Sequence, residues 1–375
     1  MRFTTLPPAG MPIDWRKQAE PNLSFPGFRL RWVQSGTAAL AFCLLHQRRR
    51  FPAVQRPQVI VPAYCCPDLV AAAIYAGYEA VVVDIQADDP GFDLGALNEA
   101  VTEQTLAVIA INFLGVAEQL ERLRAVLTPH PQVALIEDNA QWFPLPGQLN
   151  ALKGDFVTFS FGRGKAIGLL GGGLVAVSDS LLADNEPQLE LSHTGKGWPA
   201  KAWLVNQLSR PWLYHWVTRL PFLSLGQTEY HPLGALAGMP ERLKAAFSAN
   251  YVEYCALNRT AEHRLDEVFS EDDCNGFAPL FSSRRRQLLR YPLLCKNAAL
   301  QARLLEALNQ EGLGATALYQ RPLMEIPGIS GLNVKAPFAT PNAAAFASRL
   351  ITLPTHSGVR PTHLDAVASI LERHQ

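Results

Sequence analysis

Residues 133–177 read VALIEDNAQWFPLPGQLNALKGDFVTFSFGRGKAIGLLGGGLVAV, and this stretch holds three short, mostly apolar runs. They are Val133–Asp138, Asp155–Phe161 and Leu174–Val177. Continuous rather than alternating apolar runs are typical of strands buried on both faces of a largely parallel sheet. Three earlier runs share the pattern, at Val59–Ala63, Ala80–Ile85 and Ala107–Asn112. Longer stretches with helical spacing separate the runs, so we predict an α/β fold with helices on both faces of the sheet.

The second half of the chain has a different pattern. Four of the seven tryptophans fall in a Pro-bearing stretch between about residues 181 and 230. Beyond it we predict a long helix from Glu241 to about Val268, a strand at Leu288–Leu294, and helices at Ala298–Gln310 and Thr362–Arg373. We therefore expect an N-terminal arm at 1–30, a large domain with the mostly parallel sheet at 31–230, and a smaller α+β C-terminal domain at 231–375.

Composition excludes several classes of function. The 375 residues include 33 Lys+Arg and 33 Asp+Glu, so there is no basic excess for a dedicated nucleic-acid binder. The six cysteines form no CxxC pair and have no histidine at ligand spacing, so we expect no metal site and a reducing compartment. The first residues contain Pro and Gly where a secretion signal needs an apolar stretch, so we expect a cytoplasmic protein.

The segment Gln34–Leu40 places a glycine and two hydroxyl groups at the start of an apolar helix. Free backbone N–H groups and the helix dipole at such a start can bind a phosphate. The alternative is that Ser35 or Thr37 merely caps the helix, because hydroxyl caps are common. The pattern alone leaves both interpretations open.

Asp138 follows the buried run Val133–Ile136, at the edge of the sheet where ligands bind in open α/β folds. A carboxylate there can hold a cation or a protonated ring nitrogen. It can equally be the N-cap of the next helix.

The lysines favour the functional interpretation. Only Lys17 occurs in the first 152 residues, and Lys153 and Lys165 then flank the fifth predicted strand. Lys165 lies at the carboxyl end of that strand, where Asp138 also lies, whereas Lys153 lies at the amino end. Ser160, Arg163 and the run Gly171–Gly173 surround Lys165 in sequence. A lysine able to form a Schiff base, a carboxylate and two phosphate-binding elements are what pyridoxal phosphate (PLP) requires.

The chain also resembles a known family over nearly its whole length. The matching segments, in order, are Ser35–Leu40, Val59–Tyr64, Val83–Ile85, Glu137–Gln141, Phe159–Phe161 with Lys165, Tyr319 with Arg321–Leu323, and Leu353–His356. In order and spacing they are similar to the DegT/DnrJ/EryC1/StrS family of PLP-dependent sugar aminotransferases.

The resemblance implies an aspartate-aminotransferase-like homodimer. It implies that Lys165 carries the cofactor, that Asp138 pairs with the pyridine nitrogen, and that Gln141 lies near the phenolic oxygen. It further implies a phosphate site made of Ser160, the backbone of Gly36, Thr37 and Ala38, and the Thr37 hydroxyl. Lys165 would also be the base that moves the substrate proton.

Two positions depart from the family pattern. The family usually has an aromatic residue stacked on the cofactor ring where this chain has Cys66. Tyr64, Phe113 or Trp142 could substitute, Cys66 could itself contact the ring, or Cys66 could be an ordinary core residue. Many members also contribute an asparagine to the neighbouring subunit's phosphate site, at a position where this chain has Ala237 or Gly238. Arg163 can compensate, because a guanidinium binds phosphate in a bidentate way, unless it is simply solvated.

The expected function is transfer of an amino group from an amino acid, by resemblance glutamate, to a nucleotide- or lipid-linked keto-sugar. The alternatives are a deoxygenating PLP enzyme and a non-enzymatic PLP protein of the same fold. Relatives that deoxygenate have histidine in place of the lysine, so Lys165 argues against the first.

The stretch 198–225 combines Trp198, Trp203, Trp212 and Trp216 with arginines and prolines. It is too polar to span a bilayer, but it could lie against a membrane surface as a peripheral contact. The alternative is that it packs on its own domain or across the dimer.

Overall fold

An eight-stranded sheet forms the centre of the molecule. In this computed structural model, which describes residues 4–181, 186–192, 194–219, 228–269, 276–280 and 282–374, its strand order is β1-β7-β6-β5-β4-β2-β3-β10. The strands are β1 (Phe28–Val33), β2 (Gln58–Pro62), β3 (Glu79–Val83), β4 (Thr105–Ile111), β5 (Ala134–Asp138), β6 (Phe156–Ser160), β7 (Gly173–Ser178) and β10 (Val334–Lys335). Only the β6–β7 and β7–β1 pairs are antiparallel, so the predicted mostly parallel sheet and its six strands are confirmed.

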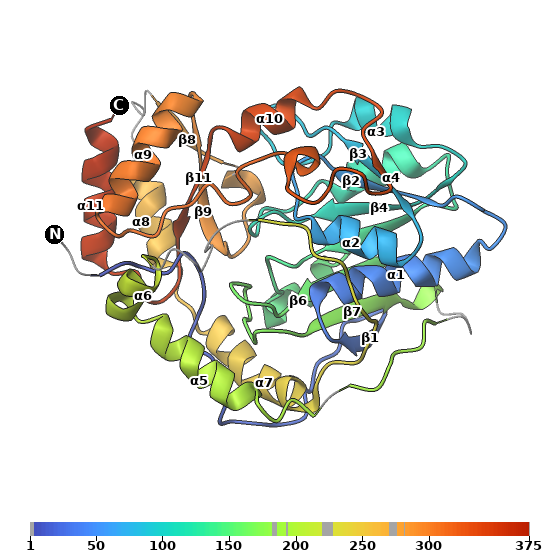
Figure 1. The fold of residues 1–375 in the computed structure, drawn as a ribbon, viewed down its shortest axis with the longest axis horizontal. Helices are drawn as coiled ribbons and strands as arrows, with labels where there is room; N and C mark the ends of the chain where they lie inside the picture. The colour runs from blue at the N-terminus through green and yellow to red at the C-terminus, as the bar shows by residue number, and fades with distance from the viewer. Residues whose placement is uncertain are drawn as a thin grey trace.

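Helices cover both faces of this sheet. On one face, α1 (Gly36–Arg50) and α2 (Asp68–Tyr75) share a core with Val59 and Val61 of β2. On the other, α3 (Leu94–Ala100) and α4 (Leu120–Leu127) share a core with Ile60. Alternate residues of one strand thus enter different cores, which explains why its sequence is continuously apolar. Figure 1 shows these layers on the right of the molecule.

Strand β1 was not predicted, and it includes Phe28, which was expected to lie in an N-terminal arm at 1–30. It runs antiparallel to β7, with Phe28 opposite Ser178 and Val33 opposite Gly173. Its sequence FRLRWV alternates, and Phe28, Leu30 and Trp32 pack on the aromatic core beneath β6 and β7. Alternation is the pattern of a strand with one solvated face, whereas the continuous apolar runs indicate strands buried on both faces.

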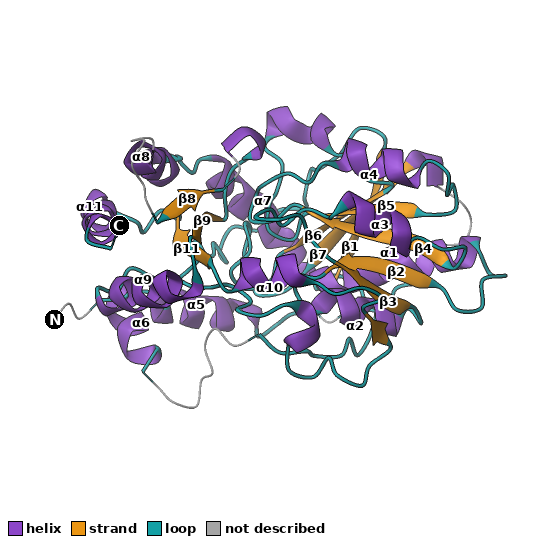
Figure 2. Ribbon diagram, turned by 90° about the horizontal axis from the view of Figure 1, so that it is seen from above, coloured by secondary structure: helices purple, strands orange, loops and turns teal. Residues whose placement is uncertain are grey.

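A second, three-stranded antiparallel sheet has the order β11-β9-β8. Its strands are β8 (Phe277–Pro279), β9 (Arg290–Cys295) and β11 (Leu350–Pro354), and it packs with α8 (Thr260–Phe269), α9 (Ala298–Gln310) and α11 (Pro361–Glu372) around a separate core. The predicted helices at 298–310 and 362–373 and the strand near 288–294 are confirmed. Figure 2 shows this unit beside the larger sheet, with α10 (Pro341–Ala347) between the two sheets.

The single long helix predicted from Glu241 to Val268 is wrong. The chain forms α7 (Glu241–Cys255) and then α8, with a break between them. Leu243 and Phe247 of α7 pack on the core below the large sheet, whereas Leu265 and Phe269 of α8 pack on the small-sheet core. One straight helix could not reach both cores. The boundary between the two domains near residue 230 stays a prediction.

The tryptophan-rich stretch forms two short helices, α5 (Trp198–Leu208) and α6 (Pro211–Val217). Pro199 and Pro211 lie in their first turns, where proline is tolerated. Residues 220–225 of the predicted membrane-facing stretch lie outside the described residues. No helix in the described ranges is long and apolar enough to span a bilayer. Short 3-10 helices occupy Pro146–Ala151, Asp179–Leu181, Ser282–Arg284 and Leu323–Glu325.

Candidate active site

The carboxyl ends of β5 and β6 bring the predicted site residues together. Asp138 is the last residue of β5, Ser160 is the last residue of β6, and Lys165 follows in the next turn. Lys165 lines a cavity of about 1260 Å³ between the two sheets, together with Gln141, Cys66 and Tyr319. The predicted site residues therefore lie at the carboxyl edge of the parallel sheet, where ligands bind in open α/β folds.

Asp138 is buried at the end of β5, with only 3% of its surface exposed. Its Oδ1 accepts a hydrogen bond from the Ala140 N–H at 2.8 Å and one from the Thr158 hydroxyl at 3.4 Å. Burial raises the pKa of this carboxyl, while the Ala140 bond and the charge of Lys165 oppose the rise. A buried carboxylate held in this way favours a cationic partner such as a protonated ring nitrogen.

The turn after β6 carries Lys165, which is half-buried. The Lys165 N–H donates to Gly162 O at 3.4 Å, and Gly164 between them has a positive φ of 73°, which glycine adopts without strain. Arg163 in the same turn is exposed and lines the same cavity. The short turn thus places an amine and a guanidinium next to the ends of β5 and β6.

A second contact joins the start of α1 to the end of β6. A Cβ added to Gly36 would lie 2.6 Å from Ser160 Cβ and 2.8 Å from its Oγ, so only glycine allows this approach. Ser35 caps the helix, because its Oγ accepts from the Ala38 N–H at 3.1 Å. The cap uses the Ala38 amide, which leaves Gly36 and Thr37 as the helix-start amides nearest Ser160. The capping interpretation is therefore confirmed for Ser35, and phosphate binding by the Gly36 and Thr37 amides stays a prediction.

Gln141 is held rigidly at the cavity wall. Its Oε1 accepts from the Leu114 N–H at 2.8 Å and its Nε2 donates to the Tyr319 hydroxyl at 3.1 Å. Leu114 and Tyr319 were not among the predicted site residues, although both line the cavity. Leu114 has a positive φ of 55°, which no local sequence signal indicates.

The candidate ring contacts occupy different places. Cys66 lines the cavity, and burial raises the pKa of its thiol to about 12, with the charge of Asp68 raising it and that of Lys165 lowering it. Tyr64 is buried in an aromatic cluster with Phe113, Phe346 and Tyr319, and its hydroxyl donates to Ala317 O at 3.4 Å. Trp142 is buried beneath the Arg286 guanidinium, 4.1 Å from its ring centroid. Of the four candidates, only Cys66 is at the cavity wall in the described part of the chain.

Glu137, next to Asp138 in sequence, has a structural role. It is fully buried, and it accepts hydrogen bonds from the Asn112 side chain at 2.9 Å and from the Lys153 and Gly154 N–H groups at 2.8 and 3.1 Å. These bonds join β5 to the loop before β6. Glu137 thereby fixes the carboxyl end of β5, which presents Asp138, against the start of β6.

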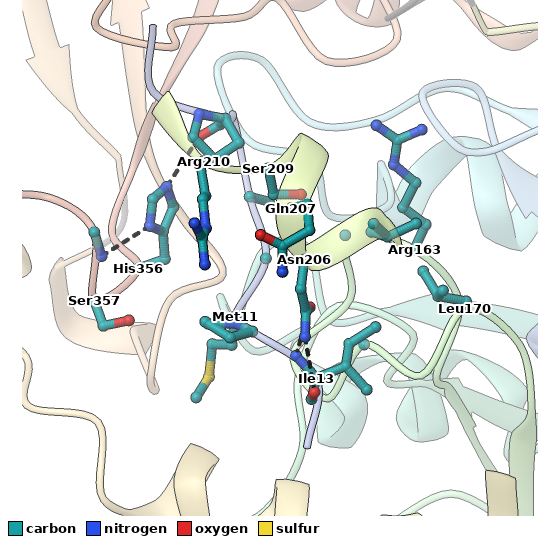
Figure 3. A pocket seen from close by; sticks show the side chains of 18 of the residues that line it. Met11, Ile13, Arg163, Leu170, Asn206, Gln207, Ser209, Arg210, His356 and Ser357 are labelled. Carbon is teal, nitrogen blue, oxygen red and sulfur yellow. Dashed lines mark hydrogen bonds between the residues drawn. The ribbon is translucent and has the colours of Figure 1, made fainter. Parts of the chain in front are cut away.

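The N-terminal segment separates the cavity from a second one of about 1060 Å³, shown in Figure 3. Asn206 of α5 exchanges two 2.9 Å hydrogen bonds with the backbone of Ile13, and His356 bonds to Pro7 O at 2.9 Å. Arg163 lines both cavities. The segment thus forms a shared wall between them.

The residues fit PLP on the chemistry they offer. A phosphate fits beside the Gly36–Ser160 contact, where a side chain on Gly36 would fill the space. The Asp138 carboxylate suits a protonated ring nitrogen. Lys165 offers an amine at the same edge of the sheet.

Comparison with known proteins gives a family. The model of the DegT/DnrJ/EryC1/StrS aminotransferase family matches residues 32–205 and 253–372. A UDP-N-acetyl-3-dehydro-alpha-D-glucosamine 3-aminotransferase of Acidithiobacillus ferrooxidans is 30% identical over 151 residues, which span 40% of this chain and only 40% of that relative.

Solved structures share the fold. A Streptococcus pneumoniae protein described as a sugar aminotransferase, in its PLP form, has a TM-score of 0.67 at 20% identity and covers 94% of this chain and 88% of its own. The GDP-4-keto-6-deoxy-D-mannose-3-dehydratase of E. coli has a TM-score of 0.68 at 16% identity, covering 92% and 88%. Because the family model matches most of the chain, on both sides of the cavity, this protein belongs to the DegT/DnrJ/EryC1/StrS aminotransferase family.

Proposed function

We propose that the protein is a PLP-dependent aminotransferase that moves an amino group from an amino acid, with glutamate the expected donor, to a nucleotide- or lipid-linked keto-sugar. The observation that carries the proposal is the meeting of Lys165, Asp138 and the Gly36–Ser160 contact at one edge of the sheet. The family match supports the reaction class, and the sugar-nucleotide relative supports the acceptor.

When bound, PLP supplies an electron-withdrawing ring that stabilises negative charge on the substrate carbon. Asp138 would hold a proton on the ring nitrogen, Gln141 would orient the phenolic oxygen, and Ser160 with the Gly36 and Thr37 amides would bind the phosphate. Lys165 Nζ would bind the cofactor covalently, and once released it would accept the substrate proton and return it at the neighbouring carbon.

The deoxygenating alternative is less well supported. A dehydratase has the same fold, so the fold does not separate the two reactions. The residue at the cavity is Lys165, whereas deoxygenating relatives have histidine there. A protein that binds PLP without catalysing a reaction would not need a base beside the cofactor. Lys165 lines the cavity beside Gln141 and Cys66, where it can act as such a base, so the enzymatic role is better supported.

We also propose a homodimer and a peripheral membrane contact. Trp203, Trp212 and Trp216 are 51, 54 and 55% exposed on α5 and α6, whereas Trp198 is buried and donates to Leu169 O at 2.6 Å. Residues 191–228 contain four Lys or Arg and no Asp or Glu, although the whole chain is neutral. Exposed tryptophans beside basic residues complement an anionic lipid surface.

Lys165→Ala tests the proposed function. The purified wild type incubated with PLP should absorb in the visible range, and borohydride should fix the cofactor to the peptide that contains Lys165. Lys165→Ala should lose this linkage, while Lys153→Ala, at the opposite end of β6, should keep it. Reduced cofactor on Lys153, or on no lysine, would refute the assignment. L-Glutamate followed by a panel of keto-sugar nucleotides then tests donor and acceptor separately.

A further inference from the structure

The second cavity, which adjoins the one that Lys165 lines, is large enough for a ligand of its own. Its volume is about 1060 Å³, and small-molecule sites usually have about 300–1000 Å³. The N-terminal segment 6–17, the turn after β6, the end of α5, the start of α6 and the loop after β11 form its wall. The family model matches neither the N-terminal segment nor residues 206–214. The family pattern therefore does not account for this cavity.

Apolar side chains supply much of the wall of the second cavity, among them Leu6, Pro7, Pro8, Met11, Leu170 and Trp203. Two of its polar side chains are already bonded to the protein backbone. Asn206 uses its amide oxygen and nitrogen on Ile13, and His356 uses both ring nitrogens, on Pro7 O and the Gly358 N–H. A hydrocarbon chain needs no hydrogen bonds and suits such a wall, whereas a nucleoside needs polar partners for its base and ribose.

The same wall carries an excess of positive charge. Four cations line it in the described part of the chain, Arg16, Lys17, Arg163 and Arg210, against the single carboxylate of Asp14. Asp14 is paired with Lys17 at 3.5 Å. The guanidinium groups of Arg163 and Arg210 form no ion pair with any described residue, and Figure 3 shows them with the end of α5 between them. An apolar wall with unpaired cations complements an amphiphile that has an anionic head.

Arg163 lies where the two cavities meet. It is exposed, it lines both cavities, and it is two residues from Lys165 in sequence. The proposed phosphate site of the cofactor uses Ser160 and the amides at the start of α1, so Arg163 is available for another phosphate. In a lipid-linked sugar the phosphate joins the sugar to the chain. A phosphate at Arg163 would therefore place the sugar towards Lys165 and the chain in the second cavity.

Trp203 lies at an opening of the second cavity, because it lines the cavity and is nevertheless 51% exposed. Trp212 and Trp216 on the adjoining helix α6 are exposed as well, but neither lines this cavity. The opening thus lies beside the helices that carry the proposed membrane contact. A chain that leaves the cavity past Trp203 can remain close to a bilayer.

We propose that the second cavity binds the hydrocarbon chain of a lipid phosphate and that Arg163 binds its phosphate, so that the keto-sugar acceptor is lipid-linked. The proposal rests on the proposed function and decides between the two kinds of acceptor named there. Burial of the chain supplies affinity in proportion to the apolar area removed from water, and the phosphate at Arg163 sets the position of the sugar. A nucleotide-linked sugar offers the same phosphate without the chain.

The test measures ligand binding apart from turnover. PLP-loaded wild type is titrated by calorimetry with farnesyl phosphate, below the concentration at which this lipid phosphate forms micelles. Farnesol and inorganic phosphate measure the chain and the phosphate separately, and UDP is the nucleotide probe. Farnesyl phosphate should bind more tightly than any of the other three, and UDP at equal concentration should not displace it.

Two variants separate the chain from the phosphate. Trp203→Ala should weaken the binding of both farnesyl phosphate and farnesol about tenfold, because it removes part of the apolar wall. Trp216→Ala is the matched control, since Trp216 is as exposed as Trp203 but does not line the cavity. Arg163→Gln should weaken farnesyl phosphate binding about tenfold and leave farnesol binding unchanged. Arg303→Gln, an exposed arginine of α9 that lines neither cavity, is its control.

Three results would overturn the proposal: no binding of farnesyl phosphate by the wild type, its displacement by UDP, or equal affinities in Trp203→Ala and Trp216→Ala. If Arg163→Gln loses PLP affinity and keeps its affinity for farnesyl phosphate, Arg163 belongs to the cofactor phosphate and its role here is refuted. A wild type that takes up no PLP would instead refute the proposed function. PLP-loaded wild type that binds no farnesyl phosphate would refute only the lipid site.

Discussion

At the scale of single residues, Asp138 combines two requirements that conflict. Its carboxyl is buried, which raises its pKa and disfavours its charged form, yet holding a ring nitrogen protonated needs that charge. Among the described residues, the Ala140 N–H, the Thr158 hydroxyl and the charge of Lys165 oppose this rise in pKa.

Asp138→Asn should lower turnover by several orders of magnitude, because an amide cannot keep the ring nitrogen protonated. Before PLP is added, the same variant should unfold at a higher temperature than the wild type at neutral pH. The sign follows from the raised pKa: the stability that a protonated Asp138 contributes is present at low pH and is lost as pH rises through its folded-state pKa. The difference should shrink as pH falls towards the unfolded-state pKa. Turnover close to that of the wild type would mean that Asp138 only caps the Ala140 amide.

At the scale of secondary-structure elements, the proposed phosphate site depends on the approach of α1 to the end of β6. Gly36 and Ser160 belong to elements more than a hundred residues apart in sequence, and they meet because α1 packs directly against β6 and β7. The sequence indicated a helix start and a strand end separately. Their contact follows from packing alone.

Gly36→Ala should weaken PLP binding by at least about tenfold, because its Cβ would lie 2.6 Å from Ser160 Cβ and displace one of the two elements. A titration followed by cofactor absorbance measures the change. Gly147→Ala is the matched control, since an added Cβ there meets nothing within 4 Å. Equal affinity in Gly36→Ala and the wild type would show that this contact is structural and that the phosphate binds elsewhere.

At the scale of the whole molecule, the exposed tryptophans of α5 and α6 form a surface that the family pattern does not explain. Trp212 and Trp216 lie in the stretch outside the family match, and the basic residues among them have no acidic neighbours in sequence. A membrane or a second copy of the chain would each bury this surface. Binding to an anionic membrane and binding to a second copy of the chain differ in how strongly they depend on charge.

The wild type should float with vesicles containing anionic phosphatidylglycerol at low salt and release them at high salt, because each basic residue near such a surface contributes about 1 kcal/mol that salt screens. Trp212→Ala/Trp216→Ala should not float. Val252→Ala/Met324→Ala, which removes exposed apolar side chains elsewhere, should float like the wild type. Sedimentation of the same proteins tests the other occupant, a second copy of the chain. If the wild type is a dimer that does not float and the tryptophan variant is a monomer, the surface belongs to the dimer interface.

The sequence by itself determined the large sheet, because strands buried on both faces must be continuously apolar, and it located Asp138, Ser160 and Lys165, because residues after such strands lie at one edge. It did not indicate the break between α7 and α8, which exists because the two helices serve different cores. Nor did it indicate Arg290, Tyr319 and Leu114 at the cavity, or the burial of Tyr64 away from it. These residues come from distant segments whose local patterns are those of ordinary strands and turns. Only the packing of the two sheets with the segments between them brings these residues to Lys165, and that packing depends on long-range contacts that no local periodicity records.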